Sequence, residues 1–174
     1  MKIAYSIVGL SLFGLSVLSA QHQTMPAGMS HEEHLRQLQK EEDLKRRGAL
    51  AMGFDQEGTV HHFLLQPRGG AIVVSSKNVQ DVETVAQIRM HLREIAASFG
   101  DGLFDKPVAT HGELPPGAAV MADRKDRISY RYDDRHGGGA VVMETDDRET
   151  LNALHAFLRY QIVEHKTGDP LTPQ

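Results

Sequence analysis

A short stretch near the N-terminus combines residues that bind soft metal ions. It reads MPAGMSHEEH and contains Met25, Met29, His31 and His34. Copper(I) accepts thioether and imidazole ligands together, whereas zinc prefers histidine with carboxylate and seldom binds methionine. The two histidines would lie one turn apart on a helix, with both methionines close enough to complete the ligand set of one ion. The same composition is typical of a capped, polar helix start, so a copper-binding arm and an ordinary leader both stay open as interpretations.

Histidines in the predicted helices and linker suggest a second candidate metal site, in the folded part of the chain. The sequence has ten histidines and no cysteine, which excludes thiolate metal sites, Fe–S clusters and thiol catalysis. His91 lies beside the apolar stripe of one predicted helix, and His155 falls on the stripe of another. We expect a folded site, if one forms, to join these two histidines, with His111 or Met121 supplied by the linker. The alternative for His155 is a buried imidazole hydrogen-bonded to a backbone or side-chain partner.

The remaining histidines are weaker candidates. His61 and His62 begin a predicted strand with side chains on opposite faces, so only one can join a given cluster. His165 closes the last predicted helix, where a partly positive imidazole suits the negative end of the helix dipole, and we interpret it as a structural cap. The candidate copper ligands are therefore Met25, Met29, His31, His34, His62, His91, His111, Met121 and His155.

Two segments of the chain share one pattern and define the fold prediction. Residues 60–100 and 126–168 each run from strand through glycine-rich turn to strand and amphipathic helix, and GGAIVV in the first matches GGAVVM in the second. The turns PRGG and HGGG supply the glycines that tight hairpins need. We therefore predict an α+β fold in which a duplicated ββα unit forms a four-stranded antiparallel sheet with two helices on one face.

Capping signals set the helix boundaries. Ser30 and Glu33 form a capping box at the start of a highly charged N-terminal helix, which we expect to be solvated or loosely docked because its apolar stripe is thin. The helix of the first repeat is predicted to begin near Asn78. The helix of the second repeat is predicted to begin at Asp146 or Asp147.

The N-terminus indicates an exported protein. Residues 1–20 have the positive start, apolar run and small final residues of a signal peptide cleaved after Ala20. The apolar run is shorter than the about 20 residues of a stable membrane span, although an uncleaved anchor is the alternative. We expect the mature chain to be periplasmic or secreted and not stably inserted in a membrane. The formal charge of −4 offers no basic field for nucleic acid.

The predicted organisation follows from these segments. The connection between the repeats is rich in proline and glycine, includes PPG, and is long enough to be functional or partly disordered. The expected parts are the signal peptide at 1–20, the Met/His arm and charged helix at 21–58, the ββα domain at 59–170 with its linker at 100–126, and a tail at 171–174.

Several motifs resemble those of a known family. RRGALAMGFDQ, HHF, IRMHLREIA, HGELPPG and HAFLRYQIVEHKTGDP resemble a family of exported bacterial proteins for which no activity is established. The resemblance extends over residues 30–170, most of the mature chain. It implies an exported, folded domain and does not imply a particular reaction.

The functional prediction rests on the metal ligands. The chain has no G-x-S-x-G elbow, no P-loop and no H-E-x-x-H motif, so enzymatic activity is not favoured. We predict an exported protein that binds or sequesters copper through histidine and methionine. The alternative is a metal-free module of the cell envelope that binds a ligand or another envelope protein.

Overall fold

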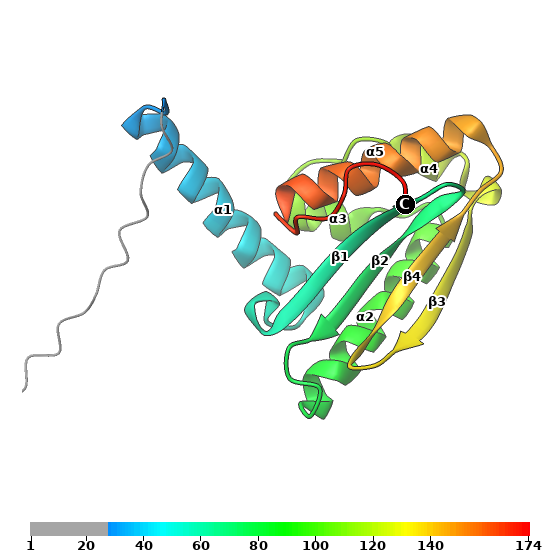
Figure 1. Ribbon diagram of the computed structural model, residues 1–174, viewed down its shortest axis with the longest axis horizontal. Coiled ribbons are helices and arrows are strands. Elements are labelled where there is room, and N and C mark those ends of the chain that lie inside the picture. Colours follow the sequence, from blue (N-terminus) through cyan, green and yellow to red (C-terminus); the bar gives the residue numbers. More distant parts are fainter. Residues whose placement is uncertain (1–27) are drawn as a thin grey trace, which may run out of the picture.

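Each predicted repeat forms two strands followed by a helix. A computed structural model describes residues 28–174. The first repeat gives β1 (Thr59–Gln66), β2 (Gly69–Ser76) and α2 (Val82–Gly100), and the second gives β3 (Ser129–Arg135), β4 (Gly138–Glu144) and α5 (Arg148–Glu164). The strands form one antiparallel sheet in the order β1-β2-β4-β3, which confirms the predicted α+β fold (Figure 1). The predicted signal peptide and Met25 lie outside the described residues.

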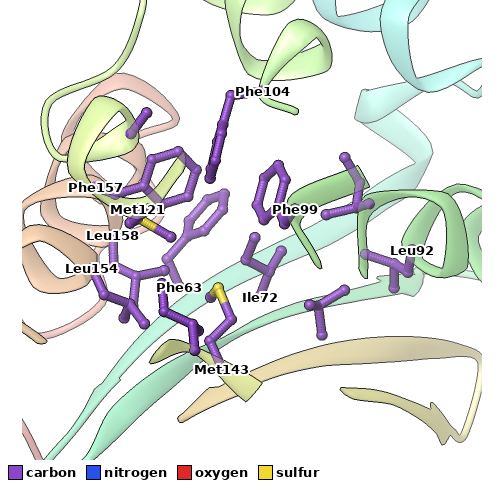
Figure 2. Packing of buried hydrophobic residues seen from close by; sticks show 14 of the residues in the cluster. Phe63, Ile72, Leu92, Phe99, Phe104, Met121, Met143, Leu154, Phe157 and Leu158 are labelled. Atoms are coloured by element: carbon purple, nitrogen blue, oxygen red, sulfur yellow. The ribbon is translucent and has the colours of Figure 1, made fainter. Parts of the chain in front are cut away.

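Both long helices of the repeats pack on the same face of the sheet. α2 lies over β4 and β3, and α5 lies over β1 and β2. Because side chains alternate between the two faces of a strand, every second residue meets the helices. Figure 2 shows this core, in which Phe63, Ile72 and Met143 of the sheet lie beneath the apolar side chains of both helices. The predicted apolar stripes of the two helices thus meet over the middle of the sheet.

The glycine-rich turns are required where the two hairpins meet. A Cβ atom on Gly69 would lie 1.9 Å from the carbonyl oxygen of Met143. In the other hairpin, a Cβ on Gly138 would lie 2.0 Å from the carbonyl oxygen of Val74. Both contacts are with backbone atoms, which cannot rotate aside. The matching glycines of the two repeats therefore allow β2 and β4 to pair at the centre of the sheet.

Substitution of Gly138 by alanine is expected to destabilise the fold. The added methyl group must displace the β2 backbone, so we expect the free energy of unfolding to fall by about 2 kcal/mol or more. Gly58→Ala is the matched control, because the nearest atom to its Cβ is 4.0 Å away. Urea unfolding of the two variants checks this, and equal midpoints would contradict the close packing of β2 against β4.

The charged N-terminal helix, α1 (His31–Met52), is capped at its start and docked on the rest of the fold further along. Ser30 Oγ accepts a hydrogen bond from the Glu33 N–H at 3.2 Å, and a Glu33 carboxylate oxygen accepts one from the Ser30 N–H at 2.9 Å. The first turns project away from the sheet (Figure 1). Further along, Lys40 pairs with Glu164 of α5 at 2.9 Å, and Leu44 is buried. The capping box is confirmed, and the helix is anchored from Lys40 onward.

The connection between the repeats is folded over the core. It contains two short helices, α3 (Asp105–His111) and α4 (Ala118–Asp123), and a 3₁₀ turn at Lys125–Arg127. α3 packs against α1, and α4 packs against α5. Proline and glycine in this segment thus mark the ends of short helices rather than an open loop.

The chain after α5 runs along the outer edge of β1. The carboxylate of Asp169 accepts a hydrogen bond from the Phe63 N–H at 2.9 Å, and the Gln174 N–H donates to the Leu65 carbonyl at 3.1 Å. These contacts cover polar backbone groups that an edge strand would otherwise present to another chain. Within residues 28–174, no helix is long and apolar enough to cross a membrane.

Candidate functional site

Four histidines from different elements line one small cavity, which we call the histidine cavity. His61 comes from β1, His91 from α2, His111 from the end of α3, and His165 follows α5. The cavity has a volume of about 70 Å³. A water molecule needs roughly 10–15 Å³, and drug-sized ligands need pockets of about 300 Å³ or more. The volume therefore suits an ion with a small ligand, or a few water molecules. The other lining residues are Met52, Phe63, Ile72, Val74, Leu92, Ile95, Phe99, Lys106, Pro107, Thr110, Phe157 and Gln161.

His165 lies between two of the other imidazoles. Its ring centroid is 6.1 Å from that of His61 and 5.2 Å from that of His111. Two imidazoles bound to one ion through bonds of about 2 Å have centroids roughly 5 to 6 Å apart. Across residues 28–174, however, no three His, Asp or Glu side chains already form a group that could hold an ion. An ion bound here would therefore have two imidazole ligands, unless a third imidazole rotates toward it.

Three polar atoms at the histidine cavity have no hydrogen-bond partner among the described residues. They are His61 Nε2, His111 Nδ1 and Gln161 Nε2, and all three are buried. His111 Nε2 lies 2.9 Å from Gln161 Oε1, and since the amide oxygen can only accept, we assign the proton to Nε2. His111 Nδ1 then presents a lone pair. An unpartnered buried polar group costs about 1–3 kcal/mol, so the concentration of three at one cavity marks a place for a polar occupant.

The imidazoles of the histidine cavity are uncharged at neutral pH. Burial lowers the pKa of His61 to about 4, and the neighbouring His62 acts in the same direction. Burial also lowers the pKa of His91 to about 4 and that of His165 to about 3. The pKa of His111 is lowered as well, again mainly by burial. The neutral imidazole is the form that binds metal ions, so protons do not compete for these nitrogens at pH 7.

The charge of the surroundings restricts the kind of ion. Within the described part of the chain, none of the residues that line the histidine cavity is acidic, and Lys106 adds a positive charge at its edge. That ammonium group pairs with Glu94 at 2.7 Å. The Born cost of burying an ion grows with the square of its charge, so a divalent ion costs about fourfold more than a monovalent one here. Neutral imidazoles with the thioether of Met52 favour copper(I) over zinc or copper(II).

A larger groove opens on the other side of the same histidines. It has a volume of about 610 Å³ and lies between α1, the start of β1 and the end of α5. His61 and His165 line both this groove and the histidine cavity, so they form the wall between the two. At the groove, His62 Nδ1 lies 2.8 Å from an Asp169 carboxylate oxygen. The groove thus exposes one side of the half-buried His61 and His165 to solvent.

Of the four residues predicted for a folded site, two meet at the histidine cavity. His91 and His111 line it. His155 instead donates from Nε2 to the Gly69 carbonyl at 2.9 Å and lies 3.0 Å from that of Gln66, so it fastens the β1–β2 turn. Figure 2 shows Met121 within the apolar cluster beside α5, where it is fully buried.

The other predicted ligands lie elsewhere. His62 is half-exposed and held by Asp169, while Met29, His31 and His34 lie at the start of α1, outside the lining of the histidine cavity. His61 and His165 were not predicted as ligands, although signals existed for both. His61 has the spacing that puts it on the same strand face as Phe63, and His165 continues the helical stripe of Leu158 and Ile162.

Comparison with known proteins finds no relative: no family model matches the chain, and neither a curated protein nor a solved structure matches it. The assignment of this site therefore rests on its geometry and chemistry. The decisive features are the ring spacings around His165 and the unpartnered nitrogens of His61 and His111.

Proposed function

We propose that this protein is an exported copper-binding protein that holds copper(I) in the histidine cavity. The observation that carries the proposal is the position of His165, whose ring lies 6.1 Å and 5.2 Å from the rings of His61 and His111. These separations suit imidazoles that share an ion, and copper(I) accepts a small number of ligands. The lack of acidic side chains among the described residues that line the cavity, together with the lowered pKa values, supports a monovalent ion bound by neutral nitrogen.

The Met/His arm has a separate role in this proposal. Met29, His31 and His34 lie where α1 projects into solvent, and Met25 precedes them in the sequence (Figure 1). Ligands that lie at the end of a projecting helix must be brought together around an ion, and this ordering costs conformational entropy and weakens binding. We assign the arm to the capture of copper from solution and the histidine cavity to its retention.

The test is an anaerobic titration of the mature chain, residues 21–174, with copper(I) in competition with chelators of known affinity. The arm variant carries Met25→Leu, Met29→Leu, His31→Gln and His34→Gln in the same chain. We expect it to lose a weak class of sites and to keep the tight site within about threefold of the unchanged affinity, because Met29, His31 and His34 do not line the histidine cavity.

Two results would contradict the proposal. Loss of all tight binding in the arm variant would confine the copper chemistry to the arm. Binding no tighter than that of an unstructured histidine peptide would remove the copper proposal altogether and favour the metal-free interaction module. Zinc and copper(II) serve as control ions, and the buried charge argument expects both to bind the histidine cavity more weakly than copper(I).

A further inference from the structure

The sheet has two edge strands, β1 and β3, and in the part of the chain that the structure describes only β1 is covered. The segment after α5 runs along β1 and bonds to it through Asp169 and Gln174. β3 pairs with β4 on one side and has no strand on the other (Figure 1). An uncovered edge strand presents backbone N–H and C=O groups that can pair with another strand. The outer edge of β3 is therefore a candidate interaction surface.

The register of β3 determines which of its backbone groups face outward. Arg135 and Gly138 close a hairpin whose loop has only two residues, so these two residues form a hydrogen-bonded pair. Such pairs alternate along an antiparallel ladder, which turns the backbone groups of Tyr130, Tyr132 and Asp134 away from β4. Within the described part of the chain, no other backbone group bonds to these outward groups. A strand added at this edge would bond to these three residues.

The residues that alternate with these three carry a short pattern of charge. Tyr130 and Tyr132 pack against the core beneath the helices. Because side chains alternate along a strand, Arg131, Asp133 and Arg135 lie on the opposite, open face of the sheet. The Asp133 carboxylate pairs with the guanidinium groups of both Arg131 and Arg135. One face of β3 thus presents a positive, a negative and a positive group in a row.

The charge pattern of β3 is complementary to itself. If two copies of β3 pair antiparallel around Tyr132, the outward backbone groups of the two Tyr132 residues bond to each other, and all seven residues of the strand are paired. Arg131 of each copy then lies opposite Asp133 of the other, in a pair without backbone bonds, where side chains come closest. Pairing around Arg131, Asp133 or Asp134 would instead place like charges opposite each other, which is destabilising.

The helix-covered face of β3 adds no repulsion to this pairing. There Asp134 pairs with Arg89 of α2 at 3.1 Å and with Arg93 of α2 at 3.6 Å. The Arg93 guanidinium also lies over the Tyr132 ring, 4.5 Å from its centroid. In the pairing around Tyr132, the residue opposite Asp134 is Tyr130 of the second copy, which carries no charge. The charges on this face are therefore already met within each chain.

We propose that two copies of this chain form a symmetric dimer through the outer edges of β3, so that their four-stranded sheets join into one continuous antiparallel sheet. The dimer goes beyond copper binding and does not depend on it, because no residue of β3 lines the histidine cavity. Charges on an edge strand also serve to keep strands apart, but that role requires no complementary order. The contact is one short strand edge, so we expect a reversible dimer with a dissociation constant of about 10–100 μM.

The test is sedimentation of the copper-free mature chain, residues 21–174, over a concentration range that spans this value. Arg131→Asp and Asp133→Arg each place like charges opposite each other twice in the dimer, so each variant alone should dimerise about 30-fold more weakly or worse. In an equimolar mixture of the two variants, acidic side chains of one chain face basic side chains of the other at both positions. The mixture should therefore form a heterodimer about as readily as the unchanged chain forms its homodimer.

Arg36→Asp is the matched control for Arg131→Asp. It makes the same change in net charge at an exposed arginine of α1, where the side chain pairs with Glu32 of the same helix. The control should dimerise as the unchanged chain does. Association of the mixed β3 variants also shows that each of them is folded, because the edge forms only when β3 pairs with β4.

Three results would overturn the dimer. A chain that stays monomeric over the whole range would mean that the charges of β3 protect the edge from pairing. A dimer that persists in both Arg131→Asp and Asp133→Arg would place the contact on another surface. Single variants that are monomeric but do not associate when mixed would exclude the register around Tyr132. None of these results bears on the copper titration, which is measured separately.

Discussion

Replacement of His165 by leucine is expected to weaken copper(I) binding by about 100-fold or more while the chain stays folded. His165 is the ring that neighbours both His61 and His111, so its loss removes the imidazole common to both pairs. Loss of a metal ligand costs at least as much as loss of its supporting contacts, which is typically 10- to 100-fold. The imidazole lies in apolar surroundings that lower its pKa to about 3. Leucine, of similar size, should therefore be tolerated without loss of stability.

His155→Leu is the matched control for this experiment. It removes the same chemical group from a buried position on the same part of the chain, but His155 does not line the histidine cavity. We expect copper(I) affinity to change by less than about threefold. Stability should fall by about 2 kcal/mol, because the Gly69 carbonyl loses its imidazole donor.

The two histidine variants should thus give opposite results in the two measurements, chelator competition and urea unfolding. His165→Leu is expected to lose copper and keep its stability, and His155→Leu is expected to do the reverse. A His165→Leu chain that unfolds more easily and binds copper as before would show that His165 is a structural cap, as its position after α5 had indicated.

The fold was predictable because its signals are local. Strand alternation, the two glycine turns and the helix stripes each depend on residues within a few positions of one another. Boundaries were less accurate. The helix of the first repeat, α2, was expected to begin near Asn78. Its N-cap is instead Asp81, whose carboxylate accepts a hydrogen bond from the Thr84 N–H at 3.1 Å, while Asn78 belongs to the turn after β2.

The site was only partly predictable because its members come together through tertiary structure. His91 and His111 carried local signals, whereas His61 and His165 lie about a hundred residues apart and meet only when α5 packs over β1. The apolar stripe also placed His155 correctly as buried, but no local pattern indicates that it reaches hairpin carbonyls. Which buried histidine meets a backbone group and which meets a cavity is decided by packing.

The contacts that dock α1 were not predictable for a related reason. Its apolar stripe is thin, so the expectation was a helix that is solvated or loosely docked, with no docking partner named. In the structure the Arg47 guanidinium donates to the carbonyl oxygens of Thr110 at 3.0 Å and His111 at 3.3 Å. These carbonyls end α3 and lack partners within that short helix. A single arginine therefore ties α1 to the segment that carries His111, a contact that periodicity cannot reveal.

The titration of the buried histidines sets the pH dependence of the copper-free protein. A histidine in an unfolded chain has a pKa near about 6.5, whereas burial lowers the pKa of His61 and His91 to about 4 and that of His165 to about 3. Between these values the unfolded chain binds more protons than the folded one. Folding stability is therefore complete above about pH 6.5 and falls as the pH decreases toward the folded-state values.

We expect the free energy of unfolding to fall by about 4 kcal/mol between pH 7 and pH 5, if two of these three histidines respond fully. Carboxylates make little contribution in this window. Hydrogen bonds from Thr84 and Thr150 lower the pKa of Asp81 and of Asp147, so these helix caps lose their charge only below about pH 4. Urea unfolding at pH 7, 6 and 5 measures how steeply the free energy of unfolding depends on pH, which gives the number of protons taken up on unfolding. His165→Leu should lower that number by about one. A stability that stays level from pH 7 to pH 5 would mean that the imidazoles accept protons in the folded state, and with that the argument for a cavity of neutral, metal-binding histidines would fail.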